Sequence, residues 1–177
     1  MSTPHVLGIA GWSGSGKTTL LTRLLPLLVQ RGLRVATVKH AHHAFDVDQP
    51  GKDSYEHRRA GASEVIISSE RRWVQMHELA GEAEPTLAEL LRLIRPCNLV
   101  LVEGFKRERH PKLEVYRPSV GKPPLHAHDD RIVAVATDVP SAVTHARVVD
   151  LASIDAVTAA VLECARSLPE VLAALDG

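Results

Sequence analysis

Apolar residues follow two patterns along this chain, short continuous runs and longer stretches with helical spacing. The continuous runs at 6–10 and 98–102 predict buried strands, because a strand covered on both faces is apolar throughout. Leucines at 20, 21, 24, 25 and 28 recur at the helical period and predict a helix from Lys17 that ends at Gly32. The same signals predict further strands at 34–38, 64–68, 73–77, 113–116 and 132–136, and further helices at 53–61, 86–95, 153–164 and from 167 onward.

Strands that alternate with helices predict an α/β fold with a mostly parallel sheet flanked by helices. The strand at 73–77 is a candidate edge strand. No repeat or linker composition divides the chain, and its 177 residues suit one compact domain, so we expect a single domain over residues 1–177.

A complete phosphate-binding loop follows the first strand and opens the first helix, with the sequence Gly11-Trp12-Ser13-Gly14-Ser15-Gly16-Lys17-Thr18. Such a loop aims backbone N–H groups and the positive end of a helix at phosphate oxygens. The Lys17 ammonium reaches the β- and γ-phosphates in this arrangement, and the Thr18 hydroxyl ligates Mg²⁺. This predicts a P-loop NTPase-type three-layer fold. The expected nucleotide-binding residues are Gly11, Ser13, Gly14, Ser15, Gly16, Lys17, Thr18 and Thr19.

A second carboxylate is expected at the end of a neighbouring strand, and Glu103 follows the apolar run at 98–102. We expect it to contact the metal directly or through water, with Lys17 as the other catalytic candidate. The alternative is a strand-end carboxylate that only faces solvent.

A long loop from His40 to Lys52 is rich in His, Asp, Gly and Pro and has no period. It is a candidate transition-metal site, a loop that faces the substrate, nucleotide or partner, or a solvated loop without a role. A basic loop from Lys106 to Lys112 is expected at the ligand edge of the sheet, either to hold an anionic ligand or an acidic partner or as solvated surface. The candidate residues of the substrate or partner loop are Lys39, His40, His42, His43, Asp46, Asp48, Lys52 and Lys106.

Recognition of the base is less clear, because the Asn-Lys-x-Asp signature that many GTPases use is absent. Asp138 follows the strand at 132–136 and could accept hydrogen bonds from guanine. It could equally cap a turn before Pro140.

Composition excludes several classes of partner. With 21 basic and 21 acidic residues the chain has a formal net charge of zero, which gives no electrostatic reason to expect nucleic acid or an anionic membrane. Two residues each of Trp, Tyr and Phe argue against a base-stacking platform. No run approaches the roughly 20 apolar residues of a membrane span. The two cysteines, Cys97 and Cys164, form no framework, and a reducing cytoplasm fits them.

Several segments taken together resemble the molybdopterin-guanine dinucleotide biosynthesis adaptor proteins, the MobB family. Besides the phosphate loop, the segments that carry this resemblance are Lys39 to Asp48, Pro50 to Ser54, Ala60 to Ala62, and Leu101 to Lys106. The most specific are Lys-His-x-His-His-x-Phe-Asp-x-Asp and Glu-Gly-Phe-Lys. The resemblance extends to about Asp138, and no diagnostic motif follows residue 145.

The resemblance implies a GTP-binding protein with weak hydrolysis that acts beside the guanylyltransferase joining GMP to molybdopterin. It further implies contacts with molybdopterin or molybdoenzymes, and a homodimer whose sheet extends across the interface. Two other functions fit the same loop. One is a small-molecule kinase with Asp46 or Glu103 as the base, and the other is a metallochaperone NTPase, suggested only by the histidines.

Overall fold

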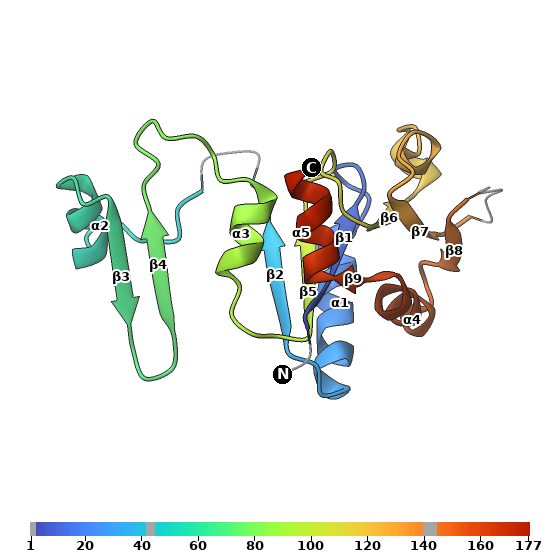
Figure 1. Ribbon diagram of the computed structural model, residues 1–177, viewed down its shortest axis with the longest axis horizontal. Helices are drawn as coiled ribbons and strands as arrows, with labels where there is room; N and C mark the ends of the chain where they lie inside the picture. Colours follow the sequence, from blue (N-terminus) through green and yellow to red (C-terminus); the bar gives the residue numbers. More distant parts are fainter. Residues whose placement is uncertain (1–2, 42–44, 140–144) are drawn as a thin grey trace. The chain divides into compact units, whose positions relative to one another are not determined.

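The computed structural model describes residues 3–41, 45–139 and 145–177 (Figure 1). Contacts divide the chain into two compact units, one of residues 1–40 and 87–177 and the other of residues 41–86. The expectation of one domain over residues 1–177 stays a prediction.

The first unit is built on a mostly parallel sheet with the strand order β2-β5-β1-β6-β7-β8 (Figure 1). Each neighbouring pair on this path is parallel, so all six carboxyl ends lie at one edge. A seventh, two-residue strand, β9, runs antiparallel to β1. The strands are β1 (His5–Ala10), β2 (Val35–Lys39), β5 (Leu99–Glu103), β6 (Lys112–Tyr116), β7 (Ile132–Thr137), β8 (Arg147–Asp150) and β9 (Arg166–Ser167).

Helices cover both faces of this sheet, because successive strand residues point to opposite sides. On one face Leu7 and Leu101 pack against leucines of α1 (Lys17–Gln30) and small residues of α4 (Ile154–Cys164). On the other face Val6 and Val100 pack against α3 (Leu87–Leu93) and α5 (Leu168–Asp176). Two short 3₁₀ turns, η1 (Pro118–Val120) and η2 (Leu125–Ala127), follow β6. The predicted three-layer α/β fold is therefore confirmed.

The second unit contains α2 (Asp53–Arg59) and a two-stranded antiparallel sheet of β3 (Glu64–Ser68) and β4 (Trp73–His77). The strands were predicted at the right residues, and they form a sheet of their own rather than part of the mostly parallel sheet. The turn at 69–72 returns the chain directly, so β4 pairs with β3 as a hairpin, with Ile66 opposite Gln75. A parallel neighbour would have needed a crossover connection.

No helix in the described part of the chain has both the length and the apolar composition that crossing a membrane requires.

Candidate functional site

The phosphate loop lies between β1 and α1 at the carboxyl edge of the sheet. Gly11 has φ 141°, and a Cβ there would lie 2.7 Å from both the Ser15 hydroxyl and the Val115 carbonyl, so only glycine fits. Gly14 and Gly16 also have positive φ, and Gly16 is the N-cap of α1. Because Gly16 lacks a side-chain cap, the first N–H groups of α1 are left to an incoming anion.

Lys17 lies over this loop, where its Nζ donates a hydrogen bond to the Trp12 carbonyl at 2.9 Å. Burial lowers the pKa of Lys17, Glu103 opposes that shift, and the charges of Lys106 and Lys39 lower the pKa further. Three ammonium groups therefore interact around the loop, a concentration of positive charge that suits a polyphosphate.

Glu103 ends β5, the strand beside β1, and its carboxylate faces the start of α1. The Thr18 hydroxyl donates to Glu103 Oε1 at 3.3 Å, and Lys39 Nζ lies 3.9 Å from Oε2. Lys39 is the register partner of Glu103 in β2, so strand pairing brings these charges together. A hydroxyl and a carboxylate at the end of a phosphate loop are oxygen donors that fit Mg²⁺, which takes few protein ligands and keeps waters and phosphates as the rest.

The Glu-Gly-Phe segment at the end of β5 packs against the start of the His-rich loop. Gly104 has φ 105°, and a Cβ there would lie 2.6 Å from the Cβ of His40. The His40 N–H donates to the Glu103 carbonyl at 2.9 Å, and the rings of His40 and Phe105 lie 5.1 Å apart. His40 therefore has a packing role beside the site, and Gly104 permits this close approach.

The side chain of Trp12, in the phosphate loop, contacts two other segments. Its indole Nε1 donates to the Pro123 carbonyl at 2.7 Å, and Lys106 Nζ lies 4.7 Å from the centre of its ring. Lys106, predicted from the basic loop, thus lies beside the phosphate loop.

His110 and Lys112, at the end of the predicted basic loop, do not lie at the ligand edge. Lys112 is buried in β6, where its Nζ lies 2.9 Å from the Asp129 carboxylate, and His110 is buried beside it. Both residues are structural, because parallel pairing places Lys112 beside Gly8 in the middle of the sheet and away from the ligand edge.

Asp138 directly follows β7 at the same edge as the phosphate loop. Its Oδ2 accepts a hydrogen bond from Nη1 of Arg117 at 2.7 Å, and Nε of Arg117 donates to the Ser15 carbonyl at 3.2 Å. Sequence reasoning missed Arg117. Only the strand order, which places β6 between β1 and β7, reveals that a residue after β6 can reach both.

The other predicted loop residues differ in exposure. Ser13, Gly14 and Thr19 are not buried, whereas Ser15 is 2% exposed and its hydroxyl has no hydrogen-bond partner among the described residues. His42 and His43 lie outside the described residues. Within the described chain no group of three or more His, Cys, Asp or Glu side chains could hold a metal ion.

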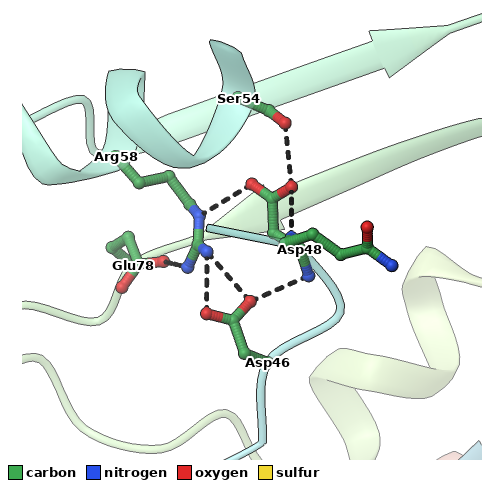
Figure 2. A network of polar contacts seen from close by, with 6 residues as sticks. Asp46, Asp48, Ser54, Arg58 and Glu78 are labelled. Carbon is green, nitrogen blue, oxygen red and sulfur yellow. Dashed lines mark hydrogen bonds and ion pairs between the residues drawn. The ribbon is translucent and has the colours of Figure 1, made fainter. Parts of the chain in front are cut away.

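Asp46 and Asp48 belong to the second unit, where they surround Arg58 of α2 together with Glu78 (Figure 2). Arg58 Nη2 donates to both oxygens of Asp46 at 2.9 Å, and Nη1 donates to Glu78 Oε1 at 2.8 Å. Arg58 Nε lies 3.5 Å from Asp48 Oδ2, while Asp48 Oδ1 accepts from the Ser54 hydroxyl at 2.9 Å. The Asp-x-Asp motif therefore fastens its loop to α2.

This network decides what Asp46 can do chemically. The hydrogen bond from Arg58, helped by the N–H of Asp48, lowers the pKa of Asp46. A carboxylate with a lowered pKa is a weaker base, which argues against Asp46 as the base of a kinase. Lys52, the N-cap residue of α2, is exposed in the same unit.

Comparison with known proteins agrees with these motifs. The family model described as MobB, molybdopterin guanine dinucleotide synthesis protein B, matches residues 6–138. This chain belongs to the MobB family. The model covers the phosphate loop, Glu103, the Arg58 network and Asp138, so the MobB match includes every residue of the candidate site described above.

Two curated MobB relatives carry the name molybdopterin-guanine dinucleotide biosynthesis adapter protein. The Escherichia coli protein is 47% identical over 138 residues, 76% of this chain and 79% of that one. The Haemophilus influenzae protein is 44% identical over 144 residues, 76% and 75% of the two chains. A crystal structure of molybdopterin-guanine biosynthesis protein B superposes with a TM-score of 0.71 at 30% identity, over 89% of this chain and 97% of that one.

Proposed function

We propose that this chain is a GTP-binding adapter protein of molybdenum cofactor biosynthesis, which assists the attachment of GMP to molybdopterin. The names of its relatives support the pathway. The observation that carries nucleotide binding is the contact between the Thr18 hydroxyl and Glu103 at the end of a complete phosphate loop.

In this proposal the backbone from Ser13 to Thr18 and the Lys17 ammonium hold the phosphates, with Thr19 at the rim. Thr18 and Glu103 hold Mg²⁺, which would neutralise phosphate charge. Asp138 accepts hydrogen bonds from guanine. The Asp138 carboxylate follows β7, which is separated from β1 by β6 alone, and lies at the edge where open α/β sheets bind ligands.

Hydrolysis by this site is slow. Fast phosphoryl transfer requires an oriented water and a cation on the developing charge. Near the phosphate loop, the guanidinium of Arg117 is already bound to Ser15 and Asp138. We expect turnover by the purified protein well below about 1 s⁻¹.

Binding of GTP by calorimetry, with Lys17→Ala as the variant, tests the proposal. We expect GTP to bind more tightly than ATP, and the variant to lose on the order of 100-fold in affinity because a half-buried cation on phosphate is removed. Arg71→Ala, which removes one exposed charge from the β3–β4 turn, is the matched control and should bind normally. Equal affinity of wild type and Lys17→Ala would contradict the proposal.

In this proposal the main protein partner of the adapter is the guanylyltransferase. Through that enzyme the adapter comes close to molybdopterin, and it later contacts molybdoenzymes. Affinity capture of the guanylyltransferase by the tagged chain, with and without GTP, tests the partnership, and we expect GTP to increase the captured amount. Cytoplasmic location fits a chain whose two cysteines, Cys97 and Cys164, are both free thiols.

We also propose that the chain is a homodimer that uses the β3–β4 hairpin as its contact surface. In the described structure these two strands pair only with each other, and an isolated two-stranded hairpin is marginal in water. Its apolar residues Ile66 and Trp73 are 64% and 52% exposed, which is typical of a surface that another chain covers.

Sedimentation of Ile66→Lys tests the dimer. We expect wild type to sediment as a dimer and the variant as a monomer, because a desolvated lysine opposes the contact. Leu93→Lys, which changes a 76% exposed leucine at the end of α3, is the control. A monomeric wild type, or a variant that stays dimeric, would contradict this interface.

A further inference from the structure

Arg117 occupies a fixed position between the two ends of the proposed nucleotide site. It directly follows β6 and precedes Pro118, and its backbone is extended at φ −132° and ψ 115°, as a residue before proline prefers. Its carbonyl accepts the Val120 N–H at 3.0 Å, which closes the η1 turn. Strand β6 and the η1 turn therefore fix the backbone of Arg117, and hydrogen bonds of the guanidinium fix the direction of its side chain.

Those contacts go to two separate elements. Nε donates to the Ser15 carbonyl of the phosphate loop at 3.2 Å, and Nη1 donates to Asp138 Oδ2 after β7 at 2.7 Å. Arginine is suited to this task, because its planar guanidinium fixes the relative direction of its donors. A lysine ammonium has no such fixed geometry.

The contact with Ser15 affects the phosphate end of the site. The peptide between Ser15 and Gly16 is planar and trans, so its carbonyl and its N–H point in opposite directions. With the carbonyl held by Arg117, the Gly16 N–H is directed away from Arg117, at the position where the phosphate-loop pattern uses backbone donors. A Cβ added at Gly16 would lie 3.8 Å from Nε of Arg117, which shows how closely the two elements approach.

The contact with Asp138 affects the base end. A carboxylate that reads guanine accepts from the ring N1–H and the 2-amino group together, which requires a defined plane for its two oxygens. Arg117 engages one lone pair of Oδ2 and leaves Oδ1 and the remaining lone pair of Oδ2 to accept further hydrogen bonds. Asp138 is about one-third exposed, so without this bond its carboxylate can rotate.

We propose that Arg117 is a positioning residue for guanine specificity, which orients Asp138 for the base while holding the Ser15–Gly16 peptide for the phosphates. The inference rests on the proposed function, since it concerns the same GTP site. It predicts that selection of the base depends on a residue that does not contact the base.

Affinities for GTP, ITP and ATP separate this role from a merely structural one. ITP lacks the 2-amino group, so the ratio of GTP to ITP affinity measures the contact with Asp138. In Arg117→Met we expect this ratio to fall on the order of tenfold, because an unoriented carboxylate loses the benefit of a hydrogen bond to the amino group. ATP affinity should fall less than GTP affinity. Arg117→Lys should recover part of the ratio, since an ammonium can reach one of the two acceptors.

Asp138→Asn supplies the second test. Its amide can donate to the 2-carbonyl of xanthine, so XTP should gain and GTP should lose affinity. Arg109→Met, which removes an exposed arginine from the loop after β5, is the matched control and should keep the wild-type ratios.

The inference is overturned if Arg117→Met leaves the GTP to ITP ratio unchanged, or lowers both affinities equally, as a role confined to the phosphate loop would do. It is also overturned if Asp138→Asn retains the wild-type ratio, since the base is then read elsewhere. In each of these cases GTP binding by the wild type leaves the proposed GTP-binding adapter function standing, although the second case would remove Asp138 from its site. Failure of the wild type to bind GTP would instead refute the proposed function itself.

Discussion

The side chain of Glu103 contacts a hydroxyl and an ammonium at once. Its Oε1 accepts from Thr18, and its Oε2 lies 3.9 Å from Lys39 Nζ. The carboxylate thereby offsets part of the positive charge around Lys17, whose pKa it raises against the effect of burial. A bound cation would replace the hydrogen bond from Thr18 with direct or water-mediated contact.

Replacement of Glu103 by glutamine tests its metal role. We expect Glu103→Gln to weaken GTP binding in Mg²⁺ on the order of tenfold, because a neutral amide is a poorer ligand for a hard cation. In EDTA the variant should bind GTP at least as well as wild type, since one negative charge near the phosphates is gone. Calorimetry in the two buffers measures both effects, with exposed Glu70→Gln as the control. An equal loss in both buffers would assign Glu103 a purely structural part.

At the residue scale, the sequence predicted those members of the site that local chemistry defines. The glycines, Lys17 and Thr18 form one contiguous motif, and Glu103 ends an unmistakable apolar run. Arg117 was not predicted, because its partners Ser15 and Asp138 lie on different elements and are brought near it only by the strand order. Nothing in the local sequence around Arg117 encodes that order.

At the scale of elements, the loop before α2 shows how one motif supports two interpretations. Its aspartates had suggested metal or substrate chemistry, but Asp46 and Asp48 face Arg58 (Figure 2). The hydrogen bonds to Glu78 and Asp46 raise the pKa of Arg58. The guanidinium also lies 5.6 Å from the centre of the Tyr55 ring. The charges of the motif are thus satisfied within the second unit and hold the loop against the helix.

Removal of this guanidinium should release the loop. In Arg58→Ala three carboxylates lose their shared cation and repel one another, so we expect cleavage between residues 45 and 52 by a nonspecific protease to accelerate at least about tenfold. Arg59→Ala is the matched control, because Arg59 also lies over the Tyr55 ring but forms no ion pair among the described residues. Equal cleavage rates for the two variants would show that the network does not hold the loop.

The boundaries of the predicted elements agree closely with the structure wherever periodicity is strong, as in β1, α1 and β5. Two strands were missed for physical reasons. β9 has only two residues, and β8 has just Val148 and Val149 between charged residues. The partners of β3 and β4 were also unpredictable, because a period of two identifies a strand without identifying its neighbour.

At the scale of the whole molecule, the net charge of zero does not reveal that several ionisable side chains are buried in the first unit, where they form a polar layer. Glu114 is fully buried on β6, where its carboxylate accepts from the His126 N–H at 3.0 Å and from the Leu125 N–H at 2.8 Å. Lys112 and Asp129 form an ion pair on the same strand and the loop that follows it. These groups anchor the long loop after β6, which also carries Pro123 to the indole of Trp12. The buried polar groups therefore hold the loop whose Pro123 carbonyl contacts Trp12 of the phosphate loop.

His110 makes the stability of this layer depend on pH. Burial, together with the nearby charge of Lys112, lowers the pKa of His110 to about 3, and its Nδ1 has no hydrogen-bond partner among the described residues. An unfolded histidine has a pKa near 6.5. Between these two values the unfolded chain binds a proton that the folded chain does not, so the free energy of unfolding decreases as the pH falls. His77, whose pKa the carboxylates of Glu82 and Glu64 raise, contributes stability that is present at low pH and lost as the pH rises through its folded value.

Urea unfolding at pH 7 and pH 5 isolates the contribution of His110. Each pH unit between the two pKa values changes the free energy of unfolding by about 1.4 kcal/mol. Protonation of His110 in the unfolded chain should therefore lower the free energy of unfolding of wild type by about 2 kcal/mol between pH 7 and pH 5. His110→Gln cannot take up a proton, and its loss between pH 7 and pH 5 should be smaller than that of wild type by about that amount. The comparison subtracts the opposite contribution of His77, which both proteins share. His128→Gln, at an exposed histidine, should keep the wild-type difference. If His110→Gln loses as much stability as wild type on acidification, His110 already binds a proton in the folded protein at pH 5 and the buried layer admits water.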